Sequence, residues 1–165
     1  MNKNNNKFLW VSIIILFFDQ LTKFLVQHFM VLYQTIEVTD KFFWFTYVHN
    51  TGAAFSIKFG GDNFNRIIFS VITIVLTLVV YFLFLKSKSK LEIISYSLII
   101  GGAIGNLIDR LRFGYVIDFI DWDFPDLIME RWPVFNIADS AIVIAVVLLF
   151  VNLIFFEKRN ESEDI

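Results

Sequence analysis

Four long apolar runs take up most of this chain, and they limit what it can fold into more than any other feature. The runs cover residues 8–29, 64–85, 91–111 and 134–156. The length of each run is close to the roughly 20 residues that an α-helix needs to cross about 30 Å of hydrocarbon. Hydrophobic residues make up 57% of the 165 residues, whereas roughly 45–50% is usual in soluble domains. We therefore predict one membrane domain over residues 1–165, an all-α bundle with four transmembrane helices.

The first apolar run begins close to the N-terminus, where a cleavable signal peptide would lie. It lacks an A-x-A-like cleavage site, and it continues through "DQLTKFLVQHF" instead of ending after a short apolar core. The sequence therefore favours a retained helix.

Positive residues predict which side of the membrane each connector faces. They gather before the first run, between the second and third runs and after the last: Lys3, Lys7, Lys86, Lys88, Lys90, Lys158 and Arg159. Cytoplasmic segments carry an excess of Lys and Arg, so we expect these three segments, and both termini, on the cytoplasmic side. The two longer connectors, residues 30–63 and 112–133, then face outward.

The outer connectors contain segments typical of β-strands. Residues 35–50, "TIEVTDKFFWFTYVHN", are rich in β-branched and aromatic residues, and residues 114–122, "GYVIDFIDW", have a similar composition. Isolated strands would be marginally stable, so we expect these segments to pair in a small extracytoplasmic β-sheet.

Composition and missing motifs exclude several functional classes. The net charge of −2 and the lack of a basic stripe argue against a nucleic-acid partner. The chain has no cysteine, so it has neither a disulfide nor a thiolate metal site. It also lacks HExxH, G-x-S-x-G and phosphate-loop patterns. We expect no metal and no cofactor.

Ionisable residues inside the apolar runs are the first functional candidates, because charges at membrane depth are costly. Asp19 and Lys23 are four residues apart, the spacing of an ion pair on one helix face, and the pair has a purely structural interpretation as well as a functional one. In the third run, Asn106 and Arg110 share a face. Arg110 lies near the outer end of this run, where it would contribute to a site or extend to the lipid headgroups.

Asp118 and Asp139 lie on either side of the point where the chain re-enters the membrane for the last time. Asp139 follows Asn136 by three residues, which is also the spacing of a helix-capping box. Asp118 has an alternative interpretation as a solvent-exposed strand residue, which is also the simplest interpretation of Asp121. The topology nevertheless brings Asp118 and Asp139 to a similar depth at the outer membrane edge.

Two carboxylates that share a partly dry site cannot both ionise cheaply, so one keeps a proton while the other stays charged. Such a pair can act as general acid and general base. The charged member accepts a proton from water that attacks a peptide carbonyl, and the protonated member donates to the carbonyl oxygen. The pair predicts peptide-bond hydrolysis without a metal or a covalent intermediate.

Five sequence blocks, in order, resemble those of the lipoprotein signal peptidases (signal peptidase II), bacterial membrane aspartic endopeptidases. The blocks are "DQLTK" at residues 19–23, "NTGAAFS" at 50–56, "GGAIGNLIDRL" at 101–111, "VIDFI" at 116–120 and "FNIADSAI" at 135–142. The resemblance implies that Asp118 and Asp139 are the catalytic pair. It also implies substrate-binding or supporting roles for Asp19, Lys23, Asn50, Gly52, Asn106, Arg110 and Asn136.

The resemblance further implies a substrate and a location. The family's substrate is a prolipoprotein whose lipobox cysteine carries a diacylglyceryl group, and cleavage before that cysteine releases the signal peptide. We accordingly expect a multi-pass monomer in the bacterial cell membrane, in contact with membrane lipid, with its active site near the surface of the outer leaflet. The family pattern also implies a β-cradle and a short amphipathic helix, which "SIKFGGDNFNR" at residues 56–66 would include.

Two other classes of function stay open on the residues alone. Intramembrane Asp, Lys and Arg also mark proton-coupled transporters and channels, although four spans without repeat symmetry or paired broken helices argue against this class. The outer sheet would also suit a noncatalytic assembly subunit. In that case the loss of both aspartates would leave activity intact.

Overall fold

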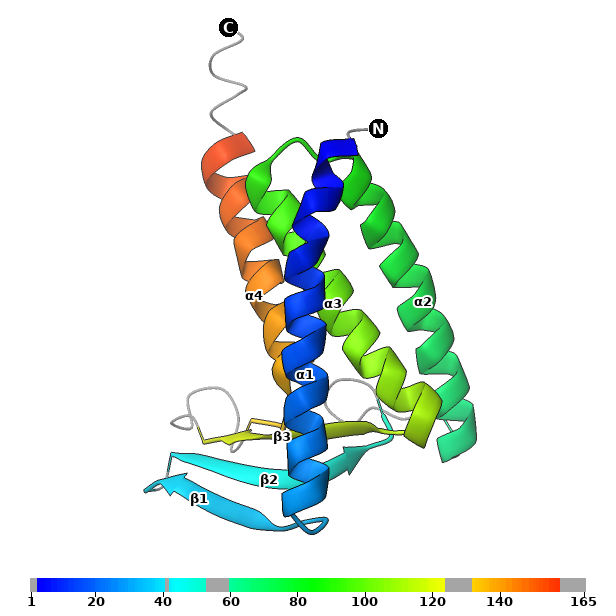
Figure 1. Cartoon of the computed structure of the whole chain (residues 1–165), viewed down its shortest axis with the longest axis vertical. Coiled ribbons are helices and arrows are strands. Elements are labelled where there is room, and N and C mark those ends of the chain that lie inside the picture. The colour runs from blue at the N-terminus through cyan, green and yellow to red at the C-terminus, as the bar shows by residue number, and fades with distance from the viewer. Residues whose placement is uncertain (1–2, 41, 53–59, 124–131, 158–165) are drawn as a thin grey trace, which may run out of the picture.

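The computed structural model describes residues 3–40, 42–52, 60–123 and 132–157, which form a helix bundle above a small sheet (Figure 1). The long helices are α1 (Leu9–Phe29), α2 (Asp62–Lys86), α3 (Lys90–Phe113) and α4 (Ile137–Asn152). The short turn η1 (Lys3–Phe8) precedes α1, and the π-helical turn η3 (Leu153–Glu157) follows α4. Among the described residues, four helices are long and apolar enough to cross a membrane, which confirms the predicted bundle of four such helices.

The predicted sheet is also present, and within the described ranges it has three antiparallel strands in the order β1-β2-β3. The strands are β1 (Thr35–Thr39), β2 (Phe43–Asn50) and β3 (Val116–Trp122). They lie at the end of the bundle opposite the start of α1 and the end of α4 (Figure 1). An irregularity between Phe45 and Val48 shifts the β2–β3 register. We call the sheet end of the bundle the outer end and the opposite end the inner end.

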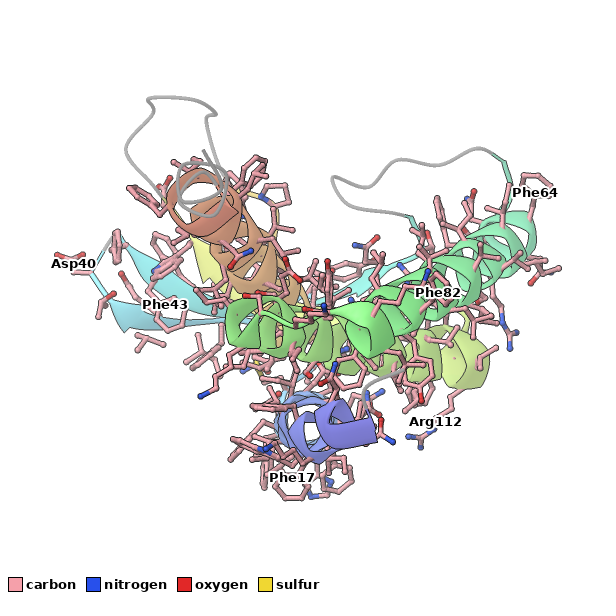
Figure 2. The ribbon with its side chains drawn as sticks, turned by 90° about the horizontal axis from the view of Figure 1, so that it is seen from above. Phe17, Asp40, Phe43, Phe64, Phe82 and Arg112 are labelled. Carbon is pink, nitrogen blue, oxygen red and sulfur yellow. The ribbon has the colours of Figure 1, made fainter. Side chains whose placement is uncertain are left out.

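Helix α3 is the centre of the bundle. Helix α1 covers one side of α3, while α2 and α4 diverge from each other on the other side (Figure 2). The large apolar side chains of α2 and α4 are widely exposed, as Leu78 (63%) and Phe150 (60%) illustrate. Such exposure is expected of helices whose outer faces contact lipid instead of water.

Glycines let α3 approach its neighbours closely, because Gly101 and Gly105 are four residues apart, the small-xxx-small spacing of close helix packing. A Cβ atom at Gly101 would lie 2.7 Å from the Ser12 carbonyl oxygen of α1, and one at Gly105 would meet the Asp19 carboxylate. On the α4 side, a Cβ atom at Gly102 would lie 2.5 Å from the Ala138 carbonyl oxygen. These contacts bring α1 and α4 close to the α3 backbone, and Gly105 lies next to both Asp19 and Ala138.

The end of α3 directs the chain straight into the sheet. Gly114 has a φ of +87°, the left-handed conformation that glycine adopts without strain. The chain therefore leaves α3 and enters β3 two residues later.

Some sequence predictions fall on residues outside the described ranges. Lys158 and Arg159 are among them, and so are residues 56–59 of the expected amphipathic segment. In the described part of that segment, Asp62 begins α2.

Candidate active site

The predicted pair of carboxylates lies where the sheet meets the bundle. Asp118 projects from β3 and is 1% exposed, and Asp139 is in the first turn of α4. The segment before α4 pairs with β3, because the Phe119 and Ile120 amides both donate to the Phe135 carbonyl oxygen at 3.0 and 2.7 Å. This pairing holds the beginning of α4 beside β3.

Asn136 connects the two carboxylates directly. It is the N-cap of α4, and its side-chain oxygen accepts from the Asp139 amide at 2.9 Å. In return, its own backbone amide donates to Asp139 Oδ2 at 3.3 Å. Its side-chain Nδ2 donates to Asp118 Oδ1 at 2.6 Å. The capping box expected from the spacing is therefore present, and the same asparagine reaches the second acid.

Asn50 holds the other oxygen of Asp118. Its Nδ2 atom donates to Asp118 Oδ2 at 3.0 Å, while its Oδ1 accepts from the Gly52 amide at 3.0 Å. Because a backbone N–H can only donate, it fixes which end of the Asn50 amide faces the carboxylate. Both oxygens of Asp118 thus accept from asparagine side chains.

Asn106 holds Asp139 in the same way. The Lys23 ammonium donates to Asn106 Oδ1 at 2.9 Å, and Asn106 Nδ2 donates to Asp139 Oδ1 at 2.8 Å. An ammonium group has no acceptor, so Lys23 orients the Asn106 amide with its NH₂ group toward Asp139. Asn136 Nδ2 also lies 3.0 Å from Asn106 Oδ1, which joins the three asparagines in one network.

Lys23 is the centre of a buried ion cluster next to this network. Its ammonium lies 2.9 Å from Asp19 Oδ2 and 2.9 Å from Asp109 Oδ2, and all three side chains are at most 2% exposed. Asp19 also accepts from the Ala138 amide and Asp109 from the Ile117 amide. The expected Asp19–Lys23 ion pair is present, and it connects α1 with α3, β3 and α4.

Arg110 turns toward the site instead of extending away from it. Its Nη2 atom donates to the Gly52 carbonyl oxygen at 3.4 Å, and its guanidinium lies 5.9 Å from the centre of the Phe69 ring. Gly52 in turn donates to Asn50, so three hydrogen bonds connect Arg110 to Asp118 through Gly52 and Asn50. All the catalytic and supporting residues that the sequence analysis named as site candidates lie in or beside this network.

The environment of Asp118 favours its protonated form near neutral pH. Burial raises the pKa of the Asp118 carboxyl to about 7, and the negative charge of Asp139 adds to the shift. The hydrogen bonds from Asn50 and Asn136 lower the same pKa, because donors stabilise the ionised form. Two interacting carboxyls lose their protons as a pair, so this titration is shared with Asp139.

Sequence reasoning missed three polar residues around the site. Asp109, which precedes Arg110 in the sequence, was not expected to pair with Lys23, although its depth in an apolar run was a signal for such pairing. Gln20 donates to both Asp19 and Asp109. The interpretation of Asp121 as solvent-exposed was wrong, because it is 1% exposed and accepts from the Thr46 hydroxyl at 2.5 Å.

Comparison with protein families finds one model that covers most of the chain. The model described as "Signal peptidase (SPase) II" matches residues 11–155. Among curated proteins, the lipoprotein signal peptidase of Psychromonas ingrahamii is 42% identical over 162 residues, which cover 96% of this chain and 90% of that protein. The lipoprotein signal peptidase of Geobacter metallireducens is 40% identical over 168 residues, with 99% and 100% coverage.

Solved structures agree in fold. Two structures described as bacterial membrane enzymes, determined in meso at 2.3 and 1.9 Å resolution, superpose with TM-scores of 0.78 and 0.79. They are 33% and 31% identical to this chain and cover 90% and 92% of it, or 87% and 94% of their own chains.

Proposed function

Because this chain belongs to the signal peptidase II family, we propose that it cleaves lipoprotein precursors with Asp118 and Asp139 as its catalytic residues. Family membership makes it a membrane-spanning protease of lipoprotein processing. The proposal adds an aspartic mechanism, the residues that carry it and the bond that is cut.

The observation that carries the proposal is that one asparagine, Asn136, donates hydrogen bonds to both carboxylates. Asn136 donates to Asp118 through its side chain and to Asp139 through its backbone. Two acids held this close in a buried site keep one proton between them, because the second ionisation places like charges together. One acid and one base are thereby available at the same place.

The pair works through a bound water molecule. The ionised carboxylate accepts a proton as the water oxygen attacks the peptide carbonyl carbon, and the protonated carboxyl donates its proton to the carbonyl oxygen. This step gives a gem-diol. The carboxyl that accepted the proton from water then protonates the amide nitrogen, while the other carboxylate takes a proton back from a gem-diol hydroxyl. The carbon–nitrogen bond breaks, and the pair again holds one proton.

We propose that the bond cut is the one before a diacylglyceryl-modified cysteine, with release of the signal peptide. A lipid anchor confines the neighbouring peptide bond to the membrane surface, and confinement at the right depth lowers the entropic cost of reaching the acids. The start of α4, beside the sheet, is where such a bond would meet them.

The supporting residues have distinct proposed roles. Asn50, Asn106 and Asn136 position the carboxylates, and Lys23 orients Asn106 with Asp19 as its counter-ion. Arg110 and Gly52 lie beside Asn50 and are proposed to contact the substrate backbone. We further propose a monomer in the bacterial cell membrane, with both termini cytoplasmic and the site near the outer leaflet.

A cleavage assay in detergent tests the proposed function. The purified chain is incubated with a diacylglyceryl-modified precursor and with the same precursor before lipidation, and loss of the signal peptide is followed by gel shift. We expect cleavage of the lipidated form at least about tenfold faster, because only its anchor fixes the bond at the site. Equal cleavage of both forms would contradict the proposed substrate, and no cleavage of either would contradict the proposed activity.

The pH dependence of turnover tests the shared proton. Because the pKa of Asp118 is about 7, kcat/KM is expected to fall above that pH, up to about tenfold per pH unit, as the pair loses its proton. Asn50→Ala removes a donor that stabilises the ionised form, so it raises this pKa and moves the alkaline limb to higher pH. Asn63→Ala, at an exposed position of α2, is the matched control and leaves the limb in place. A limb that moves to lower pH in Asn50→Ala would contradict the assignment.

A further inference from the structure

Glu92 is a carboxylate at the inner end of the bundle that the proposed chemistry does not use. Its Oε2 accepts from the Ser87 hydroxyl at 2.5 Å, and its Oε1 accepts from the Asn152 side-chain amide at 3.1 Å. Ser87 follows the last residue of α2, and Asn152 is the last residue of α4. The carboxylate is therefore held between the inner ends of these two helices.

Helix capping does not explain this arrangement. Ser89 is the N-cap of α3 and Glu92 lies three residues later, which is the capping-box pattern. However, Ser89 makes no side-chain capping hydrogen bond, and its hydroxyl donates to Asn152 Oδ1 at 2.9 Å. Both side chains turn toward α4 instead of closing the helix end.

The charge of Glu92 is fixed in position but not neutralised by an ion pair. Both of its hydrogen-bond donors are neutral, and the described residues place no Lys or Arg within ion-pair distance of it, although Lys88 and Lys90 are close in sequence. Glu92 is only half-buried. A rigid and partly accessible carboxylate of this kind is suited to bind a cation from another molecule.

Glu92 also shares a face of α3 with the polar residues of the outer end. It precedes Arg110 by 18 residues and Asn106 by 14, which are close to five and four helical turns at about 3.6 residues each. Asn106 contacts Asp139 of α4, and Arg110 contacts Phe69 of α2. This face therefore lies on the side of α3 where α2 and α4 diverge (Figure 2).

We propose that Glu92 binds the basic N-terminal segment of the signal peptide whose scissile bond lies at Asp118 and Asp139. This inference rests on the proposed function. Signal peptides carry a positively charged segment before an apolar core of about 7–15 residues. The distance along α3 from Glu92 to Asn106 is about 21 Å for 14 residues, which matches the length of a helical apolar core of about 14 residues. An apolar core bound along α3 between α2 and α4 thus brings the basic segment to Glu92.

The test is a double-mutant cycle between enzyme and substrate. The parent chain and Glu92→Gln each cleave two lipidated precursors, one with its natural N-terminal lysines and one with those lysines changed to glutamine, at low salt. We expect the parent to show about a fivefold higher KM for the glutamine precursor, because one favourable charge pair is lost. Glu92→Gln is expected to cleave both precursors with the same KM.

Two further variants separate charge from structure. Glu37→Gln removes a charge from β1 at the outer end and is expected to keep the fivefold difference. Glu92→Asp keeps the charge while shortening the side chain, so it is expected to keep most of the difference even if its hydrogen bonds and thermal stability are reduced. A fivefold difference that persists in Glu92→Gln, or its absence in the parent, would overturn the inference and leave the proposed function intact. No cleavage of either precursor by the parent would instead refute the proposed function, and the inference with it.

Discussion

Asp118→Asn is expected to reduce cleavage of the lipidated precursor by about a thousandfold or more, with the protein still folded. General acid–base catalysis by one side chain contributes about 10²–10⁴-fold, and this substitution also removes the proton exchange between the two acids. The side chain keeps its size, so the contacts with Asn50 and Asn136 are only partly lost. Initial rates in detergent, with the thermal unfolding midpoint of each variant, measure the effect.

Asp139→Asn is expected to have a loss of similar size, because neither acid completes the reaction alone. The control is Asp123→Asn, which removes a carboxylate just beyond β3 and is expected to change the rate less than twofold. Cleavage at more than about a tenth of the parent rate in either dyad variant would exclude the two-aspartate mechanism. No cleavage by the parent chain would instead restore the transporter and noncatalytic assembly roles.

The helices and strands were predictable because their signals are local. Each apolar run matches the thickness of a bilayer, and the β-branched and aromatic segments lie in the connectors, where helix-forming signals are weak. The meeting of Asp118 and Asp139 followed from topology, because the chain between them leaves and re-enters at one membrane surface. The first inference needs only short stretches of sequence, and the second needs only the order of the spans.

The contacts that orient the acids were not predictable from the residues alone. Lys23 and Asn106 are 83 residues apart, and their contact depends on which faces of α1 and α3 meet. Asp121 shows a second limit. Period-two alternation places Asp121 on the strand face opposite Asp118, and that face was expected to be in contact with water. In the structure β3 is buried on both faces, and the Thr46 hydroxyl donates to the Asp121 carboxylate.

Lys23→Met is expected to destabilise the protein by about 3–5 kcal/mol, the usual effect of removing one partner from a buried ionic cluster. The substitution leaves Asp19 and Asp109 buried without their shared cation, since both lie 2.9 Å from the Lys23 ammonium. Thermal unfolding in detergent measures the loss. A loss of activity in this variant has two possible causes, namely the lower stability of the protein and the loss of the Lys23 contact with Asn106.

A compensated variant separates the two roles of Lys23. Lys23→Met combined with Asp19→Asn and Asp109→Asn removes the uncompensated charges, so most of the stability is expected to return. Activity is expected to stay at least about tenfold below the parent, because Asn106 Oδ1 lacks the Lys23 donor and only the contact with Asn136 still opposes a turn of the amide oxygen toward Asp139. Repulsion between that oxygen and the carboxylate would then misplace the acid. A compensated variant with both stability and full activity would show that Lys23 only holds α1 against α3, and that Asn136 alone orients Asn106.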